Sequence, residues 1–125
     1  MIVNDTSMNI EDFRTYCLSL KGVEEGLPFG DETLVFKVGK KIFALTHLRL
    51  FTSVNLKCDP EKAVELRERY PAVIPGYHMN KKHWNTVLID GSIPDRMLKE
   101  WTKQSYDLVV ETLSKKIKQE LEEFE

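Results

Sequence analysis

The hydrophobic residues of this chain change their spacing after residue 31, and this change limits the folds that the chain can adopt. Between Asn9 and Leu20 they recur every three or four residues, which is the spacing of one face of an α-helix. From Thr33 to Lys57 they largely alternate with polar residues, which is typical of strands with one buried face. Only short turns separate these strands, so neighbouring strands are expected to pair antiparallel.

Cap and turn residues predict where the elements begin and end. Asn9, followed by Asp12, predicts the start of the first helix, and Gly22 predicts its end. Asp59-Pro60 is a strong start for a second helix, whereas residues 23–31 read as a loop. The expected elements are helix 9–21, strands 33–38, 42–46 and 50–57, helix 59–69, strands 73–79 and 83–89, and a helical region from residue 95, with or without a break near Ser105.

This order predicts an α+β fold, a two-layer α-β3-α-β2-α domain with a five-stranded antiparallel sheet and its helices on one face. The chain of 125 residues suggests one domain, which we assign to residues 1–118, followed by an acidic tail at 119–125. Its apolar runs are far shorter than the ~20 residues that span a membrane. Cys17 and Cys58 lie far apart in the sequence, which favours reduced thiols and a cytoplasmic protein without a signal peptide.

The charges are distributed unevenly along the sequence. Residues 34–85 contain ten Lys and Arg against four Asp and Glu, whereas the flanks contain eight basic and sixteen acidic residues, and the net charge is −2. The net charge argues against a strong nucleic-acid binder. The basic middle segment is consistent either with an electrostatic binding surface or with an ordinary solvated surface.

The stretch from Pro75 to Val87, PGYHMNKKHWNTV, is chemically unusual for a strand pair. Its two histidines lack a third metal ligand and flank Lys81 and Lys82, so no metal is expected. No nucleophile with an adjacent base and no phosphate-binding loop is present, so we expect neither an enzyme nor a cofactor. One alternative stays open, a small-ligand pocket that would combine Asn55, Lys57, His78 and Asn85.

Both predicted hairpin turns are basic, which favours contact with a nucleic-acid backbone. Tyr77 and Trp84 flank the second turn and could stack on bases. If Trp84 points inward, alternation places His83 and Asn85 on the exterior. Lysines at hairpin turns also serve solubility and edge protection. The predicted nucleic-acid-binding residues are Lys37, Lys40, Lys41, Lys57, His78, Lys81, Lys82, His83 and Asn85.

The block from Pro75 to Val87 resembles the hallmark of the MmcQ/YjbR-like family. Residues 29–31 with 34–44, residues 55–60 and residues 105–110 also resemble family positions. The resemblance implies a fold similar to type III secretion chaperones and frataxin-like proteins, and DNA binding through a "double wing" of two β-hairpins. Analogy with the secretion chaperones leaves a protein- or peptide-binding adaptor as the alternative.

Overall fold

One antiparallel sheet organises the molecule, with the strand order β1-β2-β3-β4-β6-β5. The structure is a computed structural model that describes residues 8–76 and 79–124. The antiparallel α+β fold predicted from the sequence is confirmed. The elements of the described residues are β1 (Val23–Gly26), β2 (Thr33–Val38), β3 (Lys41–His47), β4 (Ser53–Lys57), β5 (Val73–Pro75), β6 (Trp84–Leu88), α1 (Ile10–Ser19), α2 (Pro60–Arg69), α3 (Asp95–Glu111) and α4 (Lys115–Glu122).

The sheet has one strand more than the five predicted. Residues of β1 read as a loop in the sequence but pair antiparallel with β2, with Val23 opposite Val38. Two glutamates and a glycine follow its single valine, so the sequence of this strand shows no apolar alternation by which it could be predicted. Glu25 is also tied to α1, since the Arg14 guanidinium donates to its carboxylate at 2.5 Å. This ion pair lowers the pKa of Glu25.

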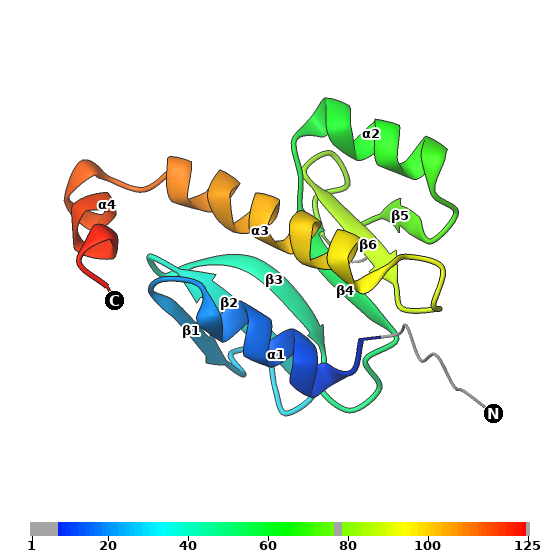
Figure 1. The fold of residues 1–125 in the computed structure, drawn as a ribbon, viewed down its shortest axis with the longest axis horizontal. Helices are drawn as coiled ribbons and strands as arrows, with labels where there is room; N and C mark the ends of the chain where they lie inside the picture. Colours follow the sequence, from blue (N-terminus) through cyan, green and yellow to red (C-terminus); the bar gives the residue numbers. More distant parts are fainter. Residues whose placement is uncertain (1–7, 77–78, 125) are drawn as a thin grey trace.

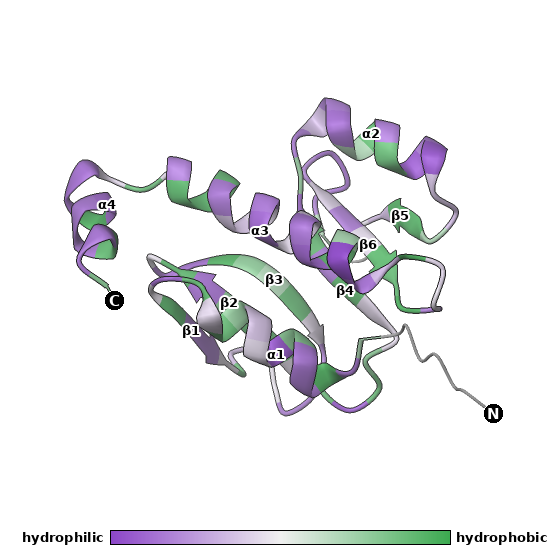
Figure 2. Ribbon diagram, in the orientation of Figure 1, coloured by the Kyte–Doolittle hydropathy of each residue, from purple (hydrophilic) through white to green (hydrophobic). Residues whose placement is uncertain are grey.

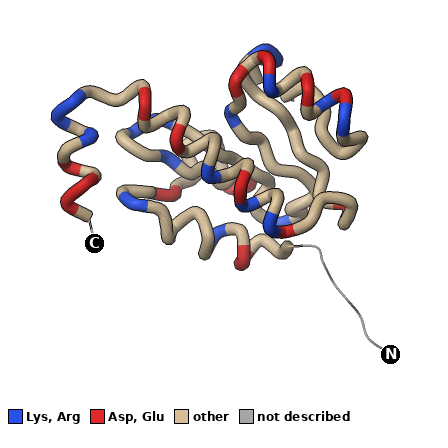
Figure 3. The backbone as a smooth tube through the Cα atoms, turned by 45° about the horizontal axis from the view of Figure 1, so that its top comes forward, with Lys and Arg blue, Asp and Glu red and all other residues tan. Residues whose placement is uncertain are grey.

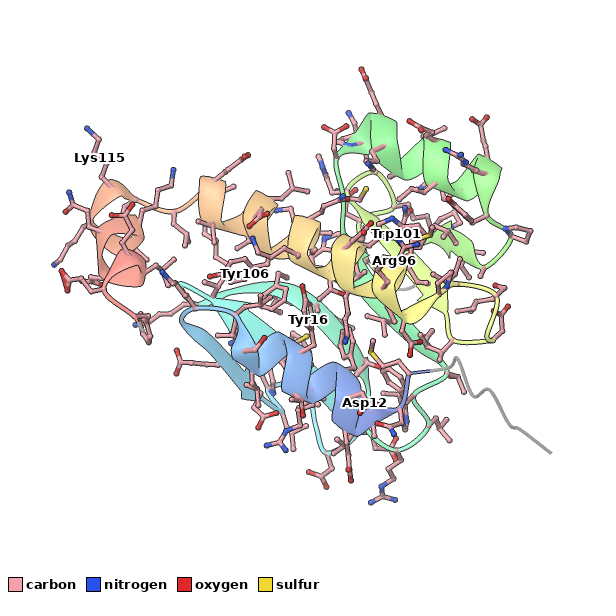
Figure 4. The ribbon with its side chains drawn as sticks, in the orientation of Figure 1. Asp12, Tyr16, Arg96, Trp101, Tyr106 and Lys115 are labelled. Carbon is pink, nitrogen blue, oxygen red and sulfur yellow. The ribbon has the colours of Figure 1, made fainter. Side chains whose placement is uncertain are left out.

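Helices α1, α2 and α3 cover one face of the sheet, which we call the covered face (Figure 1). Phe13 of α1 packs edge-on against Phe36 of β2, with ring centroids 5.7 Å apart. Tyr106 of α3 packs in the same way against Phe43 of β3 at 5.4 Å, and it projects from α3 toward the sheet (Figure 4). Hydrophobic residues concentrate in the central strands (Figure 2), so the core lies between this face and the helices.

The starts of α1 and α2 were predicted correctly from local sequence. The Asn9 side chain accepts a hydrogen bond from the Asp12 N–H at 2.8 Å, and Asp59 accepts from the N–H groups of Glu61 and Lys62. The last helical region breaks between α3 and α4 rather than near Ser105. Among the described helices, none is long and apolar enough to cross a membrane.

Helix α4 runs across residue 118, where the sequence suggested that the domain ends. Its Leu121 is buried and lies against Gly22, where an added Cβ would approach the leucine Cδ2 to 2.2 Å. Gly22 has a φ of +73°, a conformation that suits glycine. The folded domain therefore extends at least to Leu121.

The fully buried Ser105 of α3 joins the helical layer to the sheet. Its hydroxyl donates to the Phe43 carbonyl oxygen at 2.5 Å and accepts from the Lys57 N–H at 2.8 Å. The β3–β4 ladder ends at the pair Ala44–Leu56, so Phe43 and Lys57 would form the next pair. The hydroxyl thus replaces a direct backbone hydrogen bond between β3 and β4. It provides a partner for both the Phe43 carbonyl oxygen and the Lys57 N–H.

We predict that Ser105→Ala lowers the free energy of unfolding by about 2–4 kcal/mol, because it leaves a buried carbonyl and a buried N–H unsatisfied. Urea denaturation followed by circular dichroism measures this loss. Thr102→Val is the matched control, since the buried Thr102 hydroxyl donates only to Leu98 O within the same helix. An equal effect of the two substitutions would contradict the bridging role.

Candidate nucleic-acid interface

Strand pairing brings the two basic turns to the same end of the sheet. The turn at Gly39 and Lys40 joins β2 to β3, and the beginning of β3 lies beside the end of β4. The beginning of β6 also lies beside the end of β4, where Trp84 pairs with Lys57. Both turns and Lys57 therefore lie at one end of the sheet strands, and we call this end the basic edge.

The first turn is held against the C-terminal helices. An added Cβ at Gly39 would lie 2.6 Å from Leu113, and Lys41 Nζ donates to the Thr112 hydroxyl at 3.2 Å. Lys40 is exposed, whereas Lys37 is partly buried and lies opposite Glu24 in the β1–β2 ladder. Of these three lysines, Lys40 is thus the one most available to an anion.

Helix α4 adds basic residues that the sequence analysis did not include. Its first half is basic and its second half is acidic (Figure 3), and it lies next to the first turn (Figure 1). Lys115 extends away from the body of the protein (Figure 4). The acidic tail was assigned to residues 119–125, and the lysines just before it were not among the predicted binding residues. These residues are Lys115, Lys116 and Lys118.

The second turn is tied to α2 by one arginine. Arg67 Nη1 donates to the Lys81 carbonyl oxygen and to Asn85 Oδ1, both at 3.0 Å. Asn80 Oδ1 accepts from the Lys82 N–H at 2.9 Å, which fixes the turn locally. The side chains of Lys81 and Lys82 remain exposed.

The two histidines of this stretch differ in what the structure shows. His83 is partly buried, and its carbonyl oxygen accepts from the Cys58 N–H at 2.7 Å. His78, like Tyr77, lies outside the described residues. Within the described parts of the chain, no three His, Cys, Asp or Glu side chains gather as metal ligands. Cys17 and Cys58 are both free thiols, and burial raises the pKa of each.

The expected exposure of Asn85 is wrong. Asn85 is 2% exposed and pairs with Leu56, on the covered face. Its Nδ2 donates to the Ala63 carbonyl oxygen at 3.3 Å, and its Oδ1 accepts from Arg67. The amide is a buried connection between β6 and α2 that supports the second turn from behind.

The expected direction of the Trp84 side chain, toward the helices, is also wrong. Trp84 pairs with Lys57 and points to the face opposite the helices, one residue before Asn85. Residues 84–87 are all buried, so the strand has no exposed residues whose alternation would indicate its orientation. Asn55, hydrogen-bonded to the Thr86 hydroxyl, also lies on the opposite face. Asn55 and Asn85 therefore cannot line one pocket, as one alternative required.

Comparison with known proteins identifies the family. The YjbR family model matches residues 18–108. The chain belongs to the YjbR family. It is 43% identical to YbdF of Escherichia coli O157:H7 over 85% of this chain and 88% of the relative, and 34% identical to YjbR of Escherichia coli K12 over 85% and 91%. Both relatives are described as uncharacterized proteins.

Solved structures show the same fold for this YjbR-family chain. The crystal structure of Deinococcus radiodurans protein DR2400, with a DUF419 domain, has a TM-score of 0.86 and 40% identity, covering 95% of this chain and 91% of that one. A Pseudomonas syringae protein has a TM-score of 0.70 and 27% identity over 81% and 98%. The six-stranded sheet and its helices therefore agree with experimental neighbours.

We predict that Asn85→Ala lowers the free energy of unfolding by about 2–3 kcal/mol, because it removes the buried partner of Ala63 O and of the Arg67 guanidinium. Chemical denaturation measures the change. Asn80→Ala, which removes an exposed amide from the same hairpin, should cost at most about 1 kcal/mol. An Asn85→Ala protein of unchanged stability would show that the buried contacts contribute little.

Proposed function

We propose that this YjbR-family protein is a non-enzymatic module that binds DNA weakly and without sequence preference through the basic edge. The observation that carries the proposal is the strand pairing, which places the two exposed turns on either side of the end of β4. Two protruding basic turns suit the phosphate backbone of a duplex. A cytoplasmic location belongs to the same proposal.

The lysines of the edge differ in their expected contribution. Lys40, Lys81 and Lys82 are exposed, and Lys57 lies between the two turns at the end of β4. Lysine is a flexible point charge that suits phosphate, and phosphate contacts carry no sequence information, so binding without sequence preference is expected. Asn85 is excluded from the contact set by its burial.

Charge elsewhere on the molecule argues for weak affinity. Lys and Arg are interspersed with Asp and Glu along α2 and α3 (Figure 3), and the net charge is −2. A duplex that extended beyond the basic edge would meet these carboxylates. Binding should therefore be confined to a few phosphates and be strongly sensitive to salt.

We predict that log affinity for a duplex of mixed sequence falls with log salt concentration at a slope of about −3 to −4, since four lysines contribute roughly −0.9 per phosphate. Fluorescence anisotropy with labelled duplexes of two unrelated sequences measures the slope and the tolerance. A flat salt profile, or no binding at low salt, would refute the proposal.

The combined Lys40→Glu and Lys81→Glu protein should lose binding while it keeps its melting temperature, because both side chains are exposed. The matched control is Arg49→Glu with Arg96→Glu, which makes the same change in net charge. Arg49 lies in the β3–β4 connection at the other end of the sheet, and Arg96 lies at the start of α3 (Figure 4). If both double variants lose binding equally, the interaction follows net charge and does not involve the edge.

A further inference from the structure

A pocket lies between α2 and α3, above β4 and β6, and of the four lysines of the proposed DNA interface it is lined by Lys57 alone. Its apolar wall and floor include Leu56, Leu66, Val87 and Trp101. Trp101 lies on the side of α3 nearest α2 (Figure 4). The tryptophan is held by Tyr70, with ring centroids 5.3 Å apart. The pocket is therefore built on rigid strands and a fixed aromatic ring.

The volume of the pocket, about 250 Å³, limits the size of an occupant. An apolar protein cavity of about 150 Å³ is large enough to bind benzene, whereas pockets for drug-sized ligands begin at about 300 Å³. An aromatic ring or a branched alkyl group with a short polar head fits between these limits. A nucleotide or a folded peptide segment is too large.

Charged residues of both signs line the pocket, namely Lys57, Asp59 and Lys62 at the end of β4 and the start of α2, and Asp107 and Glu111 on α3. Lys62 lies in the first turn of α2, where the helix dipole disfavours a cation. Glu111 is the last residue of α3, whose last turn contains no basic residue, and there the dipole disfavours an anion. Within the described residues, neither Lys62 nor Glu111 forms an ion pair. A ligand with both charges would stabilise both helix ends.

Besides Lys62 and Glu111, the pocket lining has three charged residues: Lys57, which adds a second cation, and two aspartates whose carboxylates already accept hydrogen bonds. Asp59 accepts from the N–H groups of Glu61 and Lys62, so the start of α2 offers Lys62 rather than these amides to a carboxylate. Asp107 accepts from Lys103 Nζ at 2.7 Å. Glu111 is therefore the carboxylate left for a ligand ammonium group.

We propose that this pocket binds a small zwitterion with an apolar side chain, namely a free apolar or aromatic α-amino acid. The ligand carboxylate meets Lys62, and its ammonium group meets Glu111. Its side chain lies on Leu56 and Val87, against the Trp101 ring. A ligand that carries only negative charge is disfavoured in this pocket, because Asp107 and Glu111 border its mouth.

The proposal is tested by titrating ¹⁵N-labelled protein with L-phenylalanine and L-leucine and following the indole N–H resonance of Trp101, assigned with a Trp101→Phe sample. Saturable shifts are expected for both amino acids. Glycine, 3-phenylpropionate and phenethylamine each lack one of the three groups, and each should bind about tenfold more weakly or worse, because a charged hydrogen bond or the apolar contact is lost. No saturable shift with either amino acid would overturn the proposal, as would equal binding of all five compounds.

Variants at the mouth separate the charge contacts from the apolar floor. Lys62→Gln and Glu111→Gln should each weaken L-phenylalanine binding about tenfold without changing the melting temperature, because both side chains are exposed. Lys99→Gln and Glu100→Gln, on α3 but outside the pocket lining, are the matched controls. Unchanged binding in both mouth variants would overturn the assignment.

Two further readouts identify the occupant. Cys58 lines the pocket and is partly exposed, so saturating L-phenylalanine should slow its alkylation by iodoacetamide severalfold. Equal alkylation rates with and without the amino acid would count against binding in this pocket. If the Trp101 resonance shifts with protein concentration alone, the occupant is a second copy of the chain and the proposal fails.

Discussion

The hydroxyl of Ser105 is the contact on which the arrangement of this fold depends. The register between β2 and β3 skips Phe43, since Phe36 pairs with Ala44 and Lys37 with Ile42. At the same level β3 and β4 stop pairing, and Ser105 bridges Phe43 O and the Lys57 N–H. The Ser105 side chain bonds one backbone group on each of the two strands. It therefore fixes the position of α3 along the sheet and replaces the missing direct hydrogen bond between β3 and β4. Trp101 and Leu108 on the same helix are thereby placed over β4.

The basic edge follows from the same part of the sheet. The bulged register and the end of the β3–β4 ladder lie where both hairpin turns emerge, and each turn is supported by a different element. Thr112 and Leu113 hold the first turn, whereas Arg67 of α2 holds the second through Lys81 O. Each turn thus has at least one contact to a neighbouring element, while the Lys40, Lys81 and Lys82 side chains stay exposed. The protein needs no positive net charge for this, because its carboxylates lie mostly on the helices (Figure 3).

Sequence reasoning succeeded where the signal is local and failed where the partner is distant. Asn9 and Asp59 cap helices through N–H groups two or three residues away, so their pattern is readable in a short window. Strand β1 has no such pattern, because its pairing with β2 supplies the stability. Asn85 was placed on the exterior by alternation from an inward Trp84, yet it is buried against Ala63 and Arg67, which lie about twenty residues upstream. The α2–α3 pocket had no sequence signal, since it depends on how far apart two helices lie.

The end of β4 belongs both to the basic edge and to the pocket. Leu56 lies on the covered face, where it lines the pocket, and Lys57, the next residue, borders both the pocket and the turns. A polyanion at the basic edge is attracted by Lys57 and the turn lysines, but the pocket mouth presents Asp107 and Glu111 to it. At physiological ionic strength, screening limits such attraction and repulsion to about 8 Å, so each surface acts on what lies directly against it. A phosphate at the basic edge and a zwitterion in the pocket would therefore influence each other mainly at Lys57, which borders both sites.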